Sequence, residues 1–308
     1  MSSITQTSTE PEIRLNKHRT NYSEWMFAGL FILPFVVIYG VLFIYPTIQM
    51  LLLSLQNAPL IGAGKWVGFD NYVRLFKDRL FSVAVWNTVY FVLLSVIPST
   101  ILGLVIALGV NRLKGWAQSI ILACFFLPYI LPVTVVYRVW NWMFDSQFGI
   151  LQYPIHFFFG ENIPVFRTLP LFMPAVAFIT VWWLMGFNVL LFIAGLRNVS
   201  PEIYESASLD GASRWQQFTR ITWPLIWPVT VLVLTIQLIL QFKIFDQVYL
   251  FGQGGRVDAT MGLVQLIYRN AFQKNMGGYG ATVAVTLFAI IVIFSVLQYQ
   301  LLRARGEK

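Results

Sequence analysis

The sequence is poor in charge, cysteine and histidine. Only 11% of its residues are charged, whereas soluble domains carry about 25%. One cysteine, Cys124, excludes an intrachain disulfide, and the two histidines, His18 and His156, form no metal-binding spacing. In contrast, 57% of the residues are hydrophobic, and the mean hydropathy is +0.69. This balance predicts that much of the chain lies in a lipid bilayer.

The net charge of +8 does not indicate nucleic-acid binding, because the basic residues are scattered between apolar runs and form no stripe or arm. Lys and Arg beside membrane helices instead set their orientation. With the N-terminus inside, eleven Lys and Arg fall on the inner side and eight on the outer side. This bias predicts that both the N- and the C-terminus are cytoplasmic.

Six segments are long and apolar enough to cross a bilayer, which takes about 20 residues at a rise of about 1.5 Å each. They cover residues 25–53, 86–110, 117–144, 171–196, 225–251 and 281–302. The sequence therefore predicts an all-α integral membrane protein with six transmembrane helices. The expected organisation is a tail at 1–24, a membrane domain at 25–303 and a second tail at 304–308. Prolines inside the spans predict kinks, which are either passive or used in function.

The loop between the fourth and fifth spans, residues 197–223, differs from the other loops. Ser200 suits a helix N-cap, and Pro201 suits the first helical position, where its missing N–H costs nothing. Gly211 is placed to end this helix in the left-handed conformation. The pattern predicts a short helix that lies outside the bilayer.

A second short helix is expected to follow, because Trp215 and Phe218 begin an apolar face with helical spacing. The loop also presents small side chains at Ser206, Ala207 and Ala212, which allow another surface to approach closely. Two interpretations remain open from this pattern alone. The loop either returns the chain to the membrane or fits a groove on a cytoplasmic partner.

The run ESASLDGASRWQQFTRITWPLIWP, which begins at Glu205, resembles the EAA signature of ABC-importer permeases: E-A-A-x-x-D-G-A, then Phe, then P-L-x-x-P. The matching residues are Glu205, Ala207, Asp210, Gly211, Ala212, Phe218, Pro224 and Pro228. Ser206 stands where alanine is usual, which replaces one small residue by another. Residues 44–53 and 67–72 are similar to the carbohydrate branch of the family, so the resemblance covers nearly the whole chain from about residue 25.

The resemblance implies a type I ABC importer permease fold. It also implies a subunit that moves a sugar or sugar derivative across the bacterial inner membrane by alternating access. In this family the loop helix docks in a cleft of an ATPase. The residues that the resemblance assigns to this coupling are Glu205, Ser206, Ala207, Asp210, Gly211, Ala212 and Phe218.

The implied partners are a second homologous permease, two copies of a cytoplasmic ATPase subunit and a periplasmic or lipid-anchored solute-binding protein. The chain contains no G-x-x-x-x-G-K-[ST] loop. We therefore expect ATP and Mg²⁺ on the ATPase subunit, and neither a catalytic residue nor a cofactor or metal in this chain.

Polar residues within spans are costly and usually face the protein interior. In the fifth span, Gln237 and Gln241 share one face, Gln237 is expected near mid-bilayer, and their amides suit sugar hydroxyls. Lys243 and Asp246 pair either with each other or with the substrate. The alternative for the amides is hydrogen bonding between helices.

The fourth span contributes a second group of candidates for the substrate path: Trp182, Trp183, Gly186 and Asn188. Aromatic faces suit sugar rings, and glycine leaves room for a ligand, but the tryptophans alternatively face lipid. Arg138 in the third span, together with Lys243, suggests an anionic sugar derivative.

Two other classes of protein were weighed. A secondary transporter or channel that works without an ATPase leaves the run from Glu205 to Pro228 unexplained. A membrane-embedded enzyme needs a polar catalytic cluster, which the few His and Cys residues do not supply.

Overall fold

The computed structural model describes residues 22–252 and 258–306. The chain divides into two compact units, Met1–Gln49 and Met50–Lys308. The regular secondary structure of the described residues is helical apart from one short antiparallel pair, β1 (Gln56–Asn57) and β2 (Lys65–Trp66). The prediction of an all-α membrane protein is confirmed.

The first predicted span, residues 25–53, starts in the first unit and crosses the boundary after Gln49. Helix α1 (Tyr22–Tyr39) continues through a π-helical turn (Gly40–Ile44) into α2 (Tyr45–Ser54). Pro46 follows this turn and has no N–H for the carbonyl of residue 42, which accounts for the irregular hydrogen bonding there. The apolar run Gly29–Ser54 is long enough to cross a membrane.

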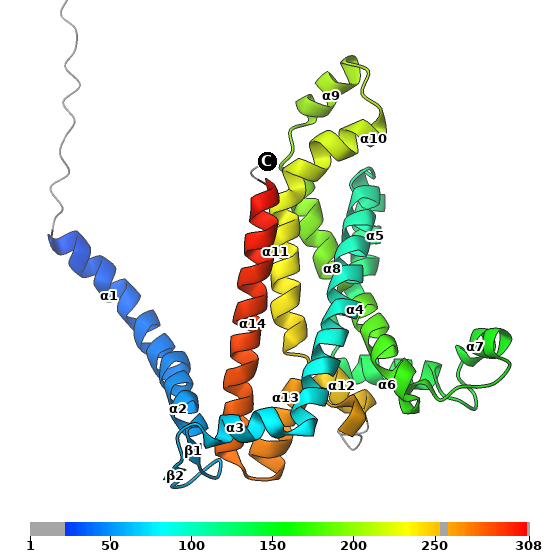
Figure 1. The fold of residues 1–308 in the computed structure, drawn as a ribbon. Coiled ribbons are helices and arrows are strands. Elements are labelled where there is room, and N and C mark those ends of the chain that lie inside the picture. Colours follow the sequence, from blue (N-terminus) through cyan, green and yellow to red (C-terminus); the bar gives the residue numbers. More distant parts are fainter. Residues whose placement is uncertain (1–21, 253–257, 307–308) are drawn as a thin grey trace, which may run out of the picture. The chain divides into compact units, whose positions relative to one another are not determined.

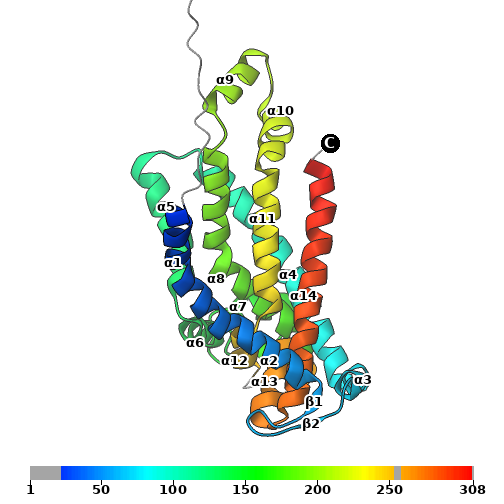
Figure 2. The same ribbon diagram turned by 90° about the vertical axis from the view of Figure 1, so that its left-hand side faces the viewer.

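The second unit is built on five long helices, which run side by side in Figures 1 and 2. These are α4 (Arg79–Val110), α5 (Gly115–Ile130), α8 (Leu169–Arg197), α11 (Trp223–Phe242) and α14 (Gly277–Gly306). Helix α8 packs along α4 and α5, and α11 packs against α4, α8 and α14. Buried aromatic residues such as Phe91, Phe192 and Phe242 fill the core between them.

The third predicted span is not one continuous helix, which corrects the prediction for residues 117–144. Helix α5 ends at Ile130, and α6 (Val133–Met143) leaves it at a bend of 98°. Pro132 explains the break, because its ring forces Leu131 into an extended conformation, with φ −68° and ψ 136°. Among the described residues, five helices are long and apolar enough to span a membrane, or six when this bent pair counts as one span.

The fifth predicted span is also shorter than expected. Helix α11 ends at Phe242, and the chain turns before α12 (Asp246–Phe251) begins. The apolar run continues past the helix end because α12 is packed into the protein, with Val248 and Phe251 buried. Burial between helices, rather than contact with lipid, thus accounts for the last part of the predicted span.

Short elements lie at the two ends of the second unit (Figures 1 and 2): α3, α12 and α13 at one end, and α9 and α10 beyond the opposite end. The short α-helices are α3 (Asp70–Lys77), α7 (Gln152–Phe159), α9 (Pro201–Leu209), α10 (Arg214–Gln217) and α13 (Leu263–Tyr268). The 3-10 and π-helical turns are η2 (Val165–Arg167), η3 (Phe218–Thr222), η4 (Asp258–Thr260) and η5 (Arg269–Gln273).

Candidate functional site

The loop between α8 and α11 forms the two short helices that the sequence predicts. Helix α9 starts with Pro201 in its first turn, while the Ser200 hydroxyl donates to Glu202 Oε2 at 3.1 Å rather than accepting from the backbone. Gly211 follows the helix with φ +76°. The local sequence therefore determines where α9 begins and where it ends.

The end of α9 is a Schellman turn, which explains the residue types in the run D-G-A. The Ala212 N–H donates to the Ala207 carbonyl at 2.9 Å, and the Gly211 N–H donates to the Ser208 carbonyl at 3.1 Å. This pairing needs a residue in the left-handed region, where glycine has no Cβ penalty. Two otherwise unsatisfied carbonyls of α9 are paired in this way.

Helix α10 starts at a capping box. The Ser213 N–H donates to Gln216 Oε1 at 2.7 Å, and the Gln216 N–H donates to Ser213 Oγ at 3.3 Å. The chain then passes through the π-helical turn η3 directly into α11, so that Arg214–Phe242 is one helical run. The loop is consequently continuous with the fifth span.

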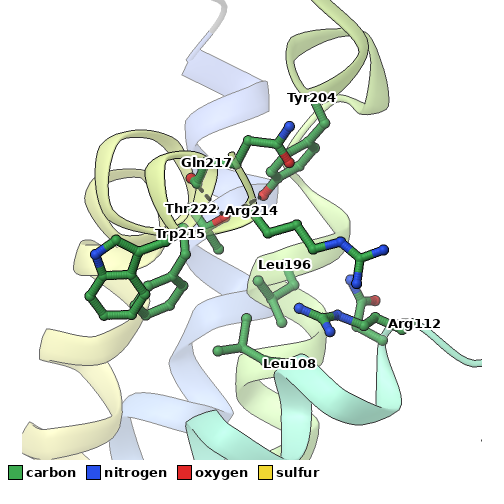
Figure 3. A pocket seen from close by; sticks show the side chains of 10 residues that line it. Leu108, Arg112, Leu196, Tyr204, Arg214, Trp215, Gln217 and Thr222 are labelled. Atoms are coloured by element: carbon green, nitrogen blue, oxygen red, sulfur yellow. Dashed lines mark hydrogen bonds between the residues drawn. The ribbon is translucent and has the colours of Figure 1, made fainter. Parts of the chain in front are cut away.

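Two side-chain contacts hold α9 to this run, and Figure 3 shows the one between Tyr204 and Thr222. The hydroxyls of Tyr204 and Thr222 lie 2.9 Å apart, and Gln217 Nε2 donates to Ser208 Oγ at 2.9 Å. Thr222 is buried. We call α9, the turn at Gly211, α10 and η3 the elbow; these contacts fix its angle.

The residues that the resemblance assigns to coupling all lie on the elbow. Glu205, Ser206, Asp210 and Gly211 are exposed, whereas Ala207, Ala212 and Phe218 are half-buried. Phe218 packs between Trp215 and Trp223, with ring centroids 5.7 and 6.3 Å away. The exposed group forms the outer surface of the elbow, and the half-buried group shapes it.

Leu209 belongs to the exposed surface of the elbow but was not among the predicted residues. Its side chain is 90% exposed at the end of α9, which is unusual for leucine because such a surface is normally buried. A leucine directly before Asp210 and Gly211, in an otherwise polar turn, is the sequence signal that identifies it.

A cavity of about 750 Å³ lies between the elbow and the ends of α4 and α8 (Figure 3). Helix α4 and the turn after it supply Leu108, Asn111 and Arg112, and α8 supplies Leu196. The elbow supplies the remaining walls: Tyr204, Arg214, Trp215, Gln217, Phe218 and Thr222.

The three amides predicted for the substrate path are buried and bonded to one another. Gln237 Nε2 donates to Asn188 Oδ1 at 2.6 Å, and Gln241 Nε2 donates to Gln237 Oε1 at 3.0 Å. The side chains of Asn188 and Gln237 are 0% and 1% exposed. The amides therefore form the hydrogen bond between helices α8 and α11 that the sequence left as the alternative to substrate contact. Contact of these amides with a substrate stays a prediction.

Gln237 does not stand midway along α11, because it lies five residues before the helix end at Phe242, and its expected place near mid-bilayer stays a prediction. Lys243 and Asp246 lie past this end and are exposed, and they form no ion pair with each other in the described chain. Their contact with substrate also stays a prediction.

The other predicted substrate residues pack within the protein or lie outside the bundle. A Cβ on Gly186 would lie 2.2 Å from the Phe125 carbonyl oxygen, so the space at this glycine is filled by α5. Trp183 Nε1 donates to the Leu131 carbonyl at 3.2 Å, and Trp182 packs edge-on against Trp140. Arg138 is exposed on α6, beyond the bend that ends α5.

The long apolar helices and the protruding elbow define a multi-pass membrane protein that carries a two-helix loop at the start of a spanning helix. Residues 99–306 match the model of the family described as binding-protein-dependent transport system inner membrane component. The chain belongs to this family.

Similar proteins agree with this assignment. The chain is 31% identical to the inner membrane ABC transporter permease protein YcjO of Escherichia coli, over 96% of this chain and 100% of the relative. It is also 31% identical to the arabinooligosaccharides transport system permease protein AraP of Bacillus subtilis, over 91% of this chain and 90% of the relative.

The fold matches a chain in the crystal structure of a bacterial alginate ABC transporter in complex with alginate pentasaccharide-bound periplasmic protein. The TM-score is 0.82 at 21% sequence identity, and the match covers 93% of this chain and 97% of that chain. The type I ABC importer permease fold that the sequence predicts is therefore confirmed.

The bonded amides predict an energetic coupling between α8 and α11. In a double-mutant cycle of Asn188→Ala with Gln237→Ala, we expect a coupling free energy of about 0.6–1.7 kcal/mol, the range for hydrogen bonds between membrane helices. Unfolding of the purified full chain measures it.

The control cycle pairs Asn188→Ala with Thr230→Ala, because the Thr230 hydroxyl bonds only within α11, to Ile226. The control pair should be additive. Additivity of the Asn188 and Gln237 variants within about 0.5 kcal/mol would contradict the structural role of the amides.

Proposed function

We propose that the chain is a permease subunit of an ATP-driven importer of a saccharide in the bacterial inner membrane, and that the elbow is its contact with the ATPase. The observation that carries this proposal is the elbow itself. Its exposed tip includes Leu209, and hydrogen bonds tie it to a helical run that continues through the fifth span.

The saccharide class is supported by the similar proteins. AraP is named for the transport of arabinooligosaccharides, and the solved transporter with the same fold is named for alginate. A solute-binding protein is expected to deliver the ligand, because the solved transporter is in complex with a periplasmic protein. Saccharide binding by that partner protein identifies the substrate most directly.

The proposed assembly contains this chain, a second homologous permease and two copies of an ATPase subunit. ATP and Mg²⁺ belong to the ATPase subunits, since the sequence here has no phosphate-binding G-x-x-x-x-G-K-[ST] loop. Catalysis of hydrolysis is accordingly assigned to the partner rather than to this chain.

The proposed mechanism requires that ATP binding changes the contacts of the elbow. A ligand shifts a conformational equilibrium only when it interacts differently with the two states. An ATPase cleft that closes around α9 supplies such a difference. Because Arg214–Phe242 is one helical run, movement of the elbow is passed to α11 and, through Gln237 and Asn188, to α8.

We expect that a polar substitution of Leu209 weakens the binding of this chain to its ATPase. Burying a leucine contributes about 1.5–3 kcal/mol, so we expect Leu209→Asp to weaken binding of the ATPase by at least about tenfold. Co-purification of the ATPase with the tagged full-length permease measures this. Leu209→Met keeps an apolar side chain and should retain the ATPase. Equal recovery of the ATPase with Leu209→Asp and wild type would rule out the elbow as the contact.

Gly211 tests whether the shape of the elbow matters for coupling. A β-branched side chain in the left-handed region costs about 1–2 kcal/mol, so Gly211→Val should distort the Schellman turn. In proteoliposomes with all subunits, we expect less saccharide uptake for each ATP hydrolysed. Gly211→Asn should keep more coupling, because asparagine tolerates this conformation.

The matched control is Gly115→Val, since Gly115 has φ +63° and, like Gly211, open space at its Cβ position, but it is the first residue of α5 and not part of the elbow. This variant should transport normally. Normal uptake and normal stimulated ATPase activity in Gly211→Val would show that the turn is not needed for coupling.

A further inference from the structure

The cavity behind the elbow carries two cations and no carboxylate on its walls (Figure 3). Arg112 comes from the turn that follows α4, and Arg214 is the first residue of α10. Within residues 22–252 and 258–306, neither guanidinium takes part in an ion pair or a side-chain hydrogen bond. Figure 3 shows both at one side of the cavity and Trp215 at the other.

Two unpaired guanidinium groups at one cavity repel each other unless an anion lies between them. Arginine offers a planar set of donors that fits the oxygens of a phosphate group and binds them through paired hydrogen bonds. Asn111 lies in the same wall, and its amide is a further donor for such an anion. The polar part of the cavity therefore suits a phosphate group.

Four of the other residues that line the cavity are apolar. Leu108 and Leu196 come from the ends of α4 and α8, and Trp215 and Phe218 come from the elbow. A small soluble phosphate ion would not bury apolar surface against these residues. A phospholipid would bury apolar surface against them, because its glycerol and upper acyl chain are apolar next to the headgroup.

The depth of the cavity also favours a lipid. Trp215, Phe218, Trp223 and Trp227 pack in sequence, with ring centroids 5.7, 6.3 and 5.3 Å apart. Tryptophan gathers where membrane meets water, and Leu108 and Leu196, near the ends of α4 and α8, line the same cavity as Trp215 and Phe218. The cavity thus lies at the level of the headgroups.

We propose that this cavity binds the phosphate of an anionic phospholipid between Arg112 and Arg214, with the apolar part of the lipid along Leu108 and Leu196. Basic pockets between membrane helices are known to hold such headgroups. The lipid joins the end of α4 to the start of α10 and so stabilises one position of the elbow. This proposal is independent of whether the elbow binds an ATPase.

The test is native mass spectrometry of the purified full-length chain, titrated separately with phosphatidylglycerol, phosphatidylcholine and glycerol 3-phosphate. We expect phosphatidylglycerol to bind at least about tenfold more tightly than phosphatidylcholine, and the double variant Arg112→Gln, Arg214→Gln to lose this preference. Arg220→Gln is the control, because Arg220 is an exposed arginine of η3 outside the cavity, and it should keep the preference.

Unchanged selectivity in the double variant would overturn the proposal. Tighter binding of glycerol 3-phosphate than of phosphatidylglycerol would overturn the lipid as the source of the phosphate. A second measurement guards against misfolding of the double variant: a photoreactive phosphatidylglycerol is crosslinked to the wild-type chain. Labelled peptides that contain Arg112 or Arg214 support the site, and labelling confined to other peptides contradicts it.

Discussion

The hydrogen bond between Tyr204 and Thr222 is the contact on which the elbow depends. Without it, α9 would be held only by the turn at Gly211 and the hydrogen bond from Gln217 to Ser208. A neutral hydrogen bond contributes about 1 kcal/mol, so this bond works together with the one between Gln217 and Ser208. Because Thr222 is the last residue of η3 and directly precedes α11, the contact fastens α9 to the start of the fifth span rather than to a loop.

Close helix packing extends the connection between the elbow and α11 to α8 and α4. Gly195 of α8 approaches α11 so closely that a Cβ there would lie 2.8 Å from the Val229 side chain. Gly103 of α4 stands in the same relation to Asn188, at 2.8 Å. Small residues of this kind let membrane helices approach each other. Movement of α11 therefore moves α8 and α4 with it, while the amides of Asn188 and Gln237 keep the register of α8 and α11.

The elbow was predictable because its signals are local. Pro201, Gly211 and the helical spacing of Trp215 and Phe218 are signals within one short run, and the family signature covers that run from Glu205 onward. Hydropathy predicted the spans correctly only where a segment is apolar because it faces lipid. Residues 246–251 include Val248 and Phe251, which are apolar because they are buried in the protein, and the helix over 117–144 is broken by Pro132. Hydropathy detects neither effect.

The partners of the polar residues depend on tertiary packing. The shared face of Gln237 and Gln241 follows from their spacing on one helix, but Asn188 meets Gln237 only because α8 packs on α11. Likewise, Arg112 and Arg214 are far apart in sequence and come to one cavity only through the angle of the elbow. The sequence alone therefore identified the polar residues but not their neighbours.

The central claim is that α9 and α11 move as one body, and a spin-label distance tests it most directly. Labels at Ile203 of α9 and Leu232 of α11 use exposed positions in a Cys124→Ser background, which removes the exposed native cysteine. In the assembled transporter, a narrow distance distribution should remain unchanged when ATP is added. A shifted or broadened distribution with ATP would show that the elbow bends, and would contradict the account.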